Sequence, residues 1–452
     1  MLPFEKIGSD LTKTIQYAGR NGLVRTFYAA RERLKSRMGE PYVYLPPSEE
    51  TLNIQRADYA RLLNGEEPEE VFRFPTRMTY APKISIVVPA LDPQKKHFQA
   101  LVESVMQQTY GNFELIVADA GKTMNVMQVL EKYQDERIIH RHLAKNAGIS
   151  ANTNLASAYA TGDYVAFLDH DDFLTPDALY ENALAILKTD AEILYSDEDK
   201  CDSAGRIFFE PNRKPDFNPD YFFANNYICH FLVMKRSLFR ALQLRSEYDG
   251  AQDYDLVLRA PKSEIFHIPK VLYHWRTHRE STAGNPASKN YAYEAGKNAL
   301  QDYFEALGVK ADVEHAAHRG FYRVTYHPDI FQCRPEVGVL GGRILNERHR
   351  VIGGRIEEDG STLYAGRHEF ESGDMHRADT RQDVYAVDAR LMKVTNALKP
   401  IYEEVFGVPY EKQETLPPVI GKEKSIAFCR KASEMGYLIV WDPEWTIVTQ
   451  EK

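Results

Sequence analysis

The chain is poor in cysteine, has no long apolar run and carries no excess of positive charge. Its four cysteines have no paired spacing that would indicate a zinc site or a disulfide framework, which favours a reducing, cytoplasmic setting. No apolar run reaches the roughly 18–20 residues that span a bilayer, and the first residues lack a signal-peptide core. The net charge of −9, from 56 basic and 65 acidic side chains, argues against nucleic acid as a partner.

The rest of the composition is that of a soluble globular protein. The 452 residues are 43% hydrophobic and 27% charged, which is ordinary for a chain that folds into two or three domains with full cores. Its patterning predicts a helical, basic N-terminal extension over 1–80, a catalytic domain over 81–315 and a smaller α/β module over 316–452.

The N-terminal extension predicts a basic amphipathic helix. Apolar residues recur at helical spacing, at Leu23, Phe27, Ala30, Leu34 and Met38. Basic residues accompany this stripe: Lys13, Arg20, Arg25, Arg31, Arg33, Lys35 and Arg37. On an acidic protein such a helix favours contact with an anionic membrane surface. The alternative is a helix that packs on the catalytic domain and leaves its charged face in water.

From residue 83 onward, strands and helices alternate. Apolar runs predict strands at 84–88, 113–117, 138–142 and 164–168, and helical patterns fill the intervals at 98–108, 125–133 and 149–160. This order predicts an α/β fold with a mostly parallel, doubly wound sheet flanked by helices. No Gly-x-Gly-x-x-Gly follows the first strand, which argues against a dinucleotide-type Rossmann site.

Three carboxylates end the fourth of these strands. Tyr164–Leu168 is continuously apolar, as in a buried parallel strand, and Asp169, Asp171 and Asp172 follow it. The carboxyl edge of such a sheet is where ligands bind. Two carboxylates that converge there repel each other unless a hard cation such as Mg²⁺ or Mn²⁺ neutralises them. The alternative is that one of the acids caps the helix that begins near Pro176.

A second acidic group opens a later helix. Asp253 and Asp255 stand at the start of a helical segment that runs to Arg259. One acid there is explained by the helix dipole, and a second acid held at a cleft is suited to act as the base for a sugar hydroxyl. The segment His274-Trp275-Arg276-Thr277-His278 follows a strand at 265–273. Its two histidines and Arg276 suggest a diphosphate or metal role beside the structural alternative.

Taken together, these motifs resemble the family 2 inverting glycosyltransferases of the GT-A fold, especially bacterial enzymes that build surface polysaccharides. The resemblance covers residues 82–283 and is carried by 83–89, 113–119, Asn146-Ala147-Gly148, 168–172, 195–200, 252–256 and 267–276. It implies a nucleotide-sugar donor, a saccharide or lipid-linked acceptor, and Mn²⁺ or Mg²⁺ as the metal.

The resemblance also implies roles for individual residues. Asp171 would bind the metal, with Asp169 on the metal and the nucleotide ribose. Asp253 would be the catalytic base, supported by Asp255. Pro89 and Asp119 would border the nucleotide base, Asn146 and Arg276 are further candidates for donor contacts, and His274 and His278 are candidate metal ligands. Asp197, Glu198 and Asp199 are assigned to the surroundings of the donor sugar or acceptor.

Two departures from the family pattern are present. Many relatives have two acids after the second strand, the second of which reads uracil, whereas here Ala120 follows Asp119 and Leu91-Asp92 replaces the usual Tyr-Asn. A uridine donor is therefore in doubt. The C-terminal segments 337–342, 401–407 and 436–443 resemble the rear half of a second such domain, and Ser425-Ile426-Ala427 stands where its Asp-x-Asp would be. This truncated module would serve packing, acceptor binding or self-association into a homo-oligomer.

The expected function is metal-dependent, inverting transfer of a sugar in the synthesis of a bacterial cell-surface polysaccharide. The expected location is the cytoplasm, peripherally on the inner face of the cell membrane if the N-terminal helix binds lipid. Two alternatives stay open. One is a non-catalytic partner subunit with the same fold, against which the presence of both Asp171 and Asp253 argues. The other is a sugar nucleotidyltransferase, which would not need the helix around Asp253.

Overall fold

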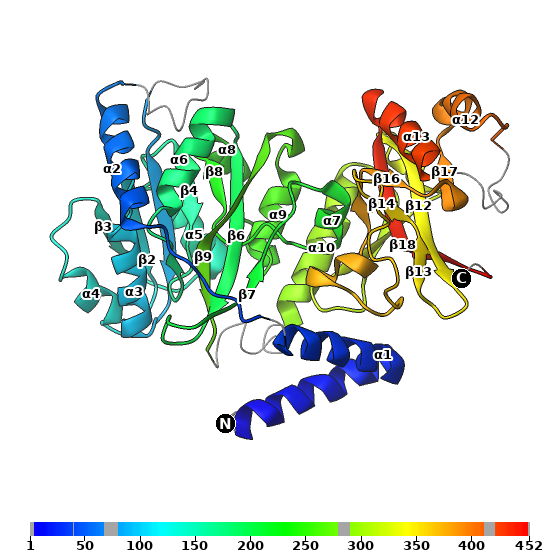
Figure 1. The fold of residues 1–452 in the computed structure, drawn as a ribbon. Helices are drawn as coiled ribbons and strands as arrows, with labels where there is room; N and C mark the ends of the chain where they lie inside the picture. The colour runs from blue at the N-terminus through cyan, green and yellow to red at the C-terminus, as the bar shows by residue number, and fades with distance from the viewer. Residues whose placement is uncertain (1–3, 39, 67–79, 279–289, 411–420, 451–452) are drawn as a thin grey trace. The chain divides into compact units, whose positions relative to one another are not determined.

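The computed structural model describes residues 4–38, 40–66, 80–278, 290–410 and 421–450 (Figure 1). The chain forms two compact units. The large unit comprises Pro41–Phe217 and Asn226–Tyr303, and the small unit comprises Met1–Glu40, Asn218–Asn225 and Phe304–Lys452. These units divide the chain at other points than the three predicted domains, because the N-terminal extension is shared between them and the segment 218–225 joins the small unit.

Parallel strands form the first half of the nine-stranded sheet of the large unit. Its order begins β3-β2-β1-β4, with strands β1 (Ile84–Ala90), β2 (Phe113–Asp119), β3 (Ile138–His142) and β4 (Tyr164–Phe167). The intervening helices are α3 (Lys95–Met106), α4 (Asn125–Leu130) and α5 (Ile149–Ser157). All pairings among these four strands are parallel. The predicted βα alternation is confirmed here, and the carboxyl ends of β1, β2 and β4 meet at one edge.

Beyond β4 the sheet is mixed. The short strand β8 (Val233–Lys235) pairs antiparallel with β4 and with β6 (Ile193–Cys201). Strand β6 runs parallel to β9 (Ile265–Arg276), which pairs antiparallel with β5 (Phe173–Leu174), and β7 (Phe208–Asn212) pairs with β6. Helices α2 (Glu49–Leu63), α6 (Ala178–Thr189), α8 (Arg236–Leu242), α9 (Gln252–Arg259) and α10 (Asn290–Ala306) complete the described helices of this part.

The core of the large unit explains why its central strands are apolar throughout. Ile86, Val88, Leu115 and Val117 are fully buried, because they pack with apolar residues such as Phe98 of α3. Burial at this scale is the main favourable free-energy term of folding. It also leaves the strand ends as the places where polar side chains reach water.

The small unit contains the second α/β module. Its five-stranded sheet is centred on β12 (Val337–Asn346), which runs parallel to β18 (Leu438–Thr449) and antiparallel to β13 (Val351–Gly353) and β17 (Met392–Val394). Strand β15 (Gln382–Asp383) pairs with β18. The other elements are the hairpin β10 (Ala311–His315) and β11 (Tyr322–Tyr326), the pair β14 (Arg355–Ile356) and β16 (Ala386–Val387), and helices α7 (Pro219–Ala224), α11 (Ile330–Cys333), α12 (Lys399–Phe406) and α13 (Lys422–Glu434).

The N-terminal helix α1 (Phe4–Met38) packs on the small unit through its polar side. It is interrupted at Gly22, whose φ of 76° is not helical. Glu32 accepts hydrogen bonds from the backbone N–H groups of Ser372 and Gly373, both at 3.0 Å. Tyr28 stacks on His368 with ring centroids 3.9 Å apart. The helix is therefore packed, but its partners are C-terminal residues of the small unit and not the catalytic domain named in the alternative.

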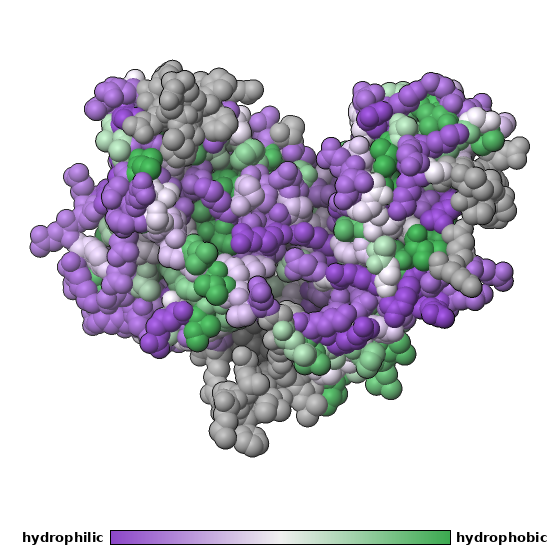
Figure 2. All heavy atoms as spheres, viewed as in Figure 1, coloured by the Kyte–Doolittle hydropathy of each residue, from purple (hydrophilic) through white to green (hydrophobic). Residues whose placement is uncertain are grey.

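The apolar stripe of α1 remains exposed. Leu23 is 81% exposed, Phe27 63%, Leu34 59% and Met38 77%, although these residues give the helix its predicted amphipathic character. Figure 2 shows apolar residues gathered on the visible side of α1. The side chains of Lys13 and Arg37 lie outside the described residues. Among the described helices, none is both long and apolar enough to cross a membrane.

Candidate functional site

The acidic loop after β4 presents two carboxylates and buries a third. Strand β4 is almost wholly inaccessible, and the chain turns directly after it, with the Asp172 N–H donating to the Asp169 carbonyl at 3.2 Å. Asp169 is exposed and the side chain of Asp171 is 24% exposed, whereas Asp172 is 1% exposed. Asp169 and Asp171 are thus accessible at the edge of the sheet, whereas Asp172 is buried within the protein.

Asp172 fastens the loop to β9. Its carboxylate accepts hydrogen bonds from the Tyr273 hydroxyl and, at 2.7 Å, from the backbone N–H of Arg276. Burial raises the pKa of Asp172 well above its usual range, and the negative charges of Asp171 and Asp169 raise it further. The Arg276 side chain is 2% exposed, and its Nε donates to the Asp171 carbonyl at 2.7 Å. Arg276 therefore holds the loop, and its guanidinium is not presented to the surface as a diphosphate ligand would be.

Asp171 and His278 form a pair with suitable donor atoms for a metal. The Nε2 of His278 lies 2.6 Å from Oδ2 of Asp171. Burial alone would raise the pKa of Asp171, but His170 and the hydrogen bond with His278 together lower it below its usual range. An ionised carboxylate and an imidazole are ligands that Mn²⁺ accepts. Among the described residues, the one group of three possible metal ligands whose atoms all lie within 4.8 Å of one another is in the small unit. Asp169 is therefore not that close to both Asp171 and His278.

A cavity connects the acidic loop with the start of α9. It is lined by Pro89 of β1, by Phe167 at the end of β4 and Leu168 and Asp169 after it, by Ile149 and Thr153 of α5, by Leu232 and Leu244, and by Gln252, Asp253 and Leu256 of α9. Its volume is about 370 Å³, including the part open to solvent. Two of the predicted acids, Asp169 and Asp253, share its walls.

The two acids of α9 have different surroundings. Asp253 stands in the first turn, where its Oδ2 accepts a hydrogen bond from Asn226 Nδ2 at 3.1 Å and its Oδ1 accepts one from the Tyr254 N–H at 2.9 Å. Asp255 is 0% exposed and is paired with Arg245 at 2.5 Å and Arg259 at 2.8 Å. Asp255 thus anchors the helix, while Asp253 faces the cavity.

The expected donor-side residues lie at strand ends but do not all face the cavity. Pro89 lines it, and β1 places Ala90 beside Asp119 of β2. Asp119 is buried, accepts from the Gly121 N–H at 2.9 Å and lies 3.6 Å from His140. Asn146 closes a local turn, because its Oδ1 accepts from the Gly148 N–H and from Asn152 Nδ2.

His274 is committed to another carboxylate. Its Nδ1 lies 2.6 Å from Oδ1 of Asp199, its ring is 2% exposed, and Tyr44, Phe173 and Phe208 surround it. Tyr42 donates to the other oxygen of Asp199 at 2.9 Å. The structure therefore brings His278 to Asp171 and keeps His274 in a separate, buried pair.

Sequence reasoning missed a buried charged cluster beside the acidic loop. Glu198 accepts hydrogen bonds from the His230 backbone N–H at 2.6 Å and from Lys214 Nζ at 3.3 Å, and the His230 ring Nδ1 lies 3.0 Å away. Burial opposes protonation of His230, but Glu198 raises its pKa to about 9, with smaller contributions from Asp169 and Asp172. No sequence motif surrounds His230 or Lys214, so only the fold could reveal this cluster.

Comparison with known proteins finds a family match within the large unit. Residues 85–243 match the family model described as "Glycosyl transferase family 2". An uncharacterized protein of Sinorhizobium fredii, y4gI, is 40% identical over 50% of this chain and 26% of its own length. The O-antigen biosynthesis protein RfbC of Myxococcus xanthus is 35% identical over 62% of this chain and 23% of its own length. The chain thus spans about a quarter of the length of these two curated relatives.

Solved structures with detectable likeness are more remote. Residues of the S. aureus protein TarS, in complex with UDP, match with a TM-score of 0.39 and 20% identity, over 49% of this chain and 65% of that chain.

The His230 cluster predicts a loss of stability at alkaline pH. Because the pKa of His230 is raised from the usual 6.5 to about 9 in the folded state, its stabilising contribution is complete below pH 6.5 and is lost as the pH rises through 9. The charged groups that face it are Glu198, Lys214, Asp169 and Asp172. The free energy of unfolding should fall by up to about 3 kcal/mol over this interval.

Urea unfolding at a series of pH values between 6 and 9.5 measures this slope. His230→Gln should flatten it, because a neutral amide has no proton to lose. His142→Gln, at a histidine whose side chain is 63% exposed, is the control and should keep the slope. An equal slope in the wild type and in His230→Gln would contradict the assignment.

Proposed function

We propose that the large unit, whose residues 85–243 are a family 2 glycosyltransferase domain, transfers a sugar from a nucleotide-diphosphate donor to a saccharide or lipid-linked saccharide acceptor. The observation that carries the proposal is the cavity that brings Asp169 and Asp253 onto common walls at the carboxyl edge of the sheet. The name of the RfbC relative, an O-antigen biosynthesis protein, supports a role in bacterial cell-surface polysaccharide synthesis.

The donor diphosphate would be bound with a divalent cation, Mn²⁺ or Mg²⁺. Asp171 and His278 have the donor chemistry for such an ion, and Asp169 is exposed two residues earlier. The metal would supply charge neutralisation for the departing diphosphate. Asp172 and Arg276 would act indirectly, since they fix the backbone from which Asp169 and Asp171 project.

Asp253 would be the general base. Its carboxylate faces the cavity and is oriented by Asn226 and by the Tyr254 N–H. In this proposal it takes the proton of the acceptor hydroxyl while the oxygen attacks the anomeric carbon. The bond to the diphosphate breaks on the opposite face, so one displacement inverts the configuration. The buried ion pairs of Asp255 would keep α9 in place during the reaction.

The acceptor is proposed to reach the enzyme at a membrane surface. The exposed apolar stripe of α1 supports this, because Arg20 and Arg33 on the same helix are also exposed and Lys35 is 60% exposed. An apolar face with basic residues is complementary to an anionic bilayer. The packing of α1 through Tyr28 and Glu32 leaves this face available.

Asp253→Asn tests the base. The amide keeps the shape and the hydrogen bond from the Tyr254 N–H but accepts no proton, so turnover should fall by roughly 10²–10⁴-fold with little change in donor affinity. A screen of nucleotide-sugar hydrolysis with Mn²⁺ identifies the donor, and the variant is then assayed with it. Glu131→Gln, at an exposed acid outside the cavity, is the matched control. Near-normal turnover in Asp253→Asn would remove Asp253 from the mechanism.

Asp171→Ala tests the metal site independently of turnover. Calorimetry with a nucleoside diphosphate should show tighter binding with Mn²⁺ than without it in the wild type, and the difference should vanish in the variant. His278→Ala should reduce the Mn²⁺ effect as well, because it removes the second donor atom of the pair. If the wild type binds equally well with and without Mn²⁺, the metal proposal fails.

Liposome co-sedimentation tests the membrane proposal. Replacing Leu23, Phe27 and Leu34 by Ser should abolish binding of the full chain to anionic vesicles at low salt, because the inserted apolar area is lost. The control changes Leu45, Leu63 and Val448, which are also exposed, to Ser and should bind normally. If both triple variants bind anionic vesicles as the wild type does, the apolar stripe has no role in membrane binding.

A further inference from the structure

The small unit contains a polar cavity of its own. It is lined by residues of α1, α7, β11, β12 and β18, of the loop 316–321 and of the segment before β15, and it measures about 710 Å³ including the part open to solvent. Four arginines are among its lining residues: Arg25, Arg323, Arg343 and Arg381. Aromatic rings of Phe321, Tyr322 and Tyr326 contribute to the wall. Planar charged groups next to aromatic rings are suited to hydrogen-bond and cover the faces of a sugar.

Three of the four arginines have a carboxylate partner in the same wall. Arg381 lies 2.5 Å from Asp442, and Arg323 lies 3.3 Å from Glu444. Arg25 lies 3.8 Å from Asp379. The remaining acid of the lining, Asp220, is paired at 2.6 Å with Arg334, which lies outside the cavity.

Arg343 has no such partner. It is 7% exposed, and its guanidinium donates to the Glu369 carbonyl at 3.1 Å and to the Thr446 hydroxyl at 3.4 Å. Within the described residues no carboxylate oxygen lies within 4.0 Å of it. An arginine stays protonated even when buried, so an anion that reached its guanidinium would form a charge-assisted hydrogen bond with it. The wall therefore holds one arginine without a direct carboxylate partner, although the charges of Glu369, Asp379 and Asp442 attract it at longer range.

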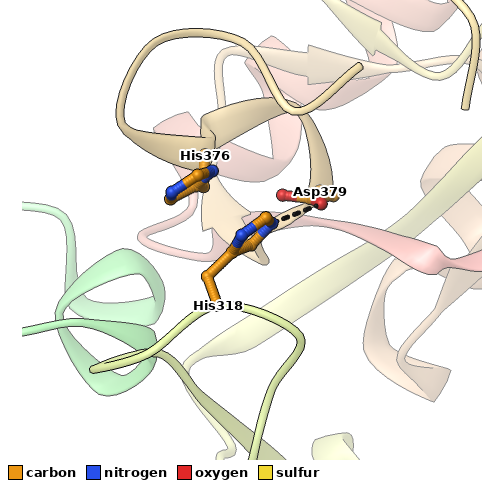
Figure 3. A group of neighbouring side chains, drawn as sticks. All are labelled: His318, His376 and Asp379. Atoms are coloured by element: carbon orange, nitrogen blue, oxygen red, sulfur yellow. Dashed lines mark hydrogen bonds and ion pairs between the residues drawn. The ribbon is translucent and has the colours of Figure 1, made fainter. Parts of the chain in front are cut away.

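A histidine cluster orients the carboxylate of Asp379 in the cavity wall. His318 Nε2 lies 3.0 Å from Asp379 Oδ2, and the rings of His318 and His376 stack with centroids 3.5 Å apart and planes at 10° (Figure 3). An imidazole binds a metal in its own ring plane at about 2 Å, and two parallel planes this far apart cannot share an ion. Despite the closeness of its three ligands, the cluster is therefore better suited to fixing Asp379, whose buried Oδ1 has no hydrogen-bond partner.

We propose that this cavity is a binding site for a saccharide that bears one acidic group, a carboxylate or a phosphate. The acidic group would pair with the guanidinium of Arg343. A hydrogen bond between two charged groups is stronger than one between neutral groups, so the acidic group would contribute most to the affinity. This inference rests on the proposed function in one respect only, namely that the ligand is taken to be a glycan.

Binding is measured by calorimetry on the full chain carrying Asp253→Asn, so that transfer does not interfere. The probes are an oligosaccharide containing glucuronate, its neutral counterpart containing glucose, a sugar phosphate and inorganic phosphate. An acidic saccharide, with either the carboxylate or the phosphate, should bind at least about tenfold more tightly than the neutral one, as expected for a charge-assisted hydrogen bond. Equal affinity for the acidic and neutral probes would overturn the proposal, as would inorganic phosphate binding as tightly as the acidic saccharides.

Two variants locate the site. Arg343→Met should weaken binding of the acidic saccharide by about tenfold or more while the melting temperature stays the same or rises, because a buried unpaired charge is removed. Arg348→Met, at an exposed arginine, is the matched control and should bind normally. Glu444→Gln, at a side chain that is 50% exposed, should tighten binding because it removes a negative charge from the wall.

Unchanged affinity in folded Arg343→Met would overturn the proposal. If that variant does not fold, the test rests on Glu444→Gln. Saccharide binding by this variant that is no tighter than that of the wild type would then overturn the proposal. The result is separable from the proposed function: saccharide binding without any transferase activity of the wild type would contradict the proposed function alone, and transfer without this binding would contradict this inference alone.

Discussion

The clamp between the acidic loop and β9 is the constraint on which the candidate site depends. Asp172 is buried at the point where β4 ends, and it accepts hydrogen bonds from Tyr273 and from the Arg276 backbone. Because a buried carboxylate without these donors would cost several kcal/mol, the loop has little freedom to take another path. The positions of Asp169 and Asp171 follow from this arrangement, and so does the approach of His278 to Asp171.

Strand β6, next to the acidic loop, contains three consecutive acids whose side chains are all bonded within the protein. Asp197 bonds to His267, Glu198 to His230 and Lys214, and Asp199 to His274. Each carboxylate is satisfied within the protein, which argues for a framework that positions the strands next to the acidic loop. Asp199 also explains why His274 is not available to the loop, since both of its oxygens are held by buried or partly buried partners.

The small unit has an ordinary apolar core and two further features that packing alone does not require. Its sheet buries an ordinary apolar core around Val339, Phe428 and Trp441, which is sufficient for packing. Two features exceed that requirement: an apolar stripe on α1 that nothing described covers, and a cavity in which Arg343 has no direct carboxylate partner. Both cost free energy in the isolated protein. The proposed membrane contact and the proposed saccharide would recover part of it.

The sequence by itself determined the parallel half of the sheet and the loop acids. Uninterrupted apolar runs such as Tyr164–Phe167 can be satisfied only by burial on both faces, and β3 (Ile138–His142) has the predicted bounds. It also predicted the acids Asp169, Asp171 and Asp253, because strand ends and helix starts are local features. Only the tertiary structure decided which partners these side chains have. Hydrogen bonds such as Asp199 to His274 and His230 to Glu198 join residues far apart in the chain, and local periodicity carries no information about such pairs. The same reason explains why α1 could be predicted as amphipathic while the side through which it packs could not.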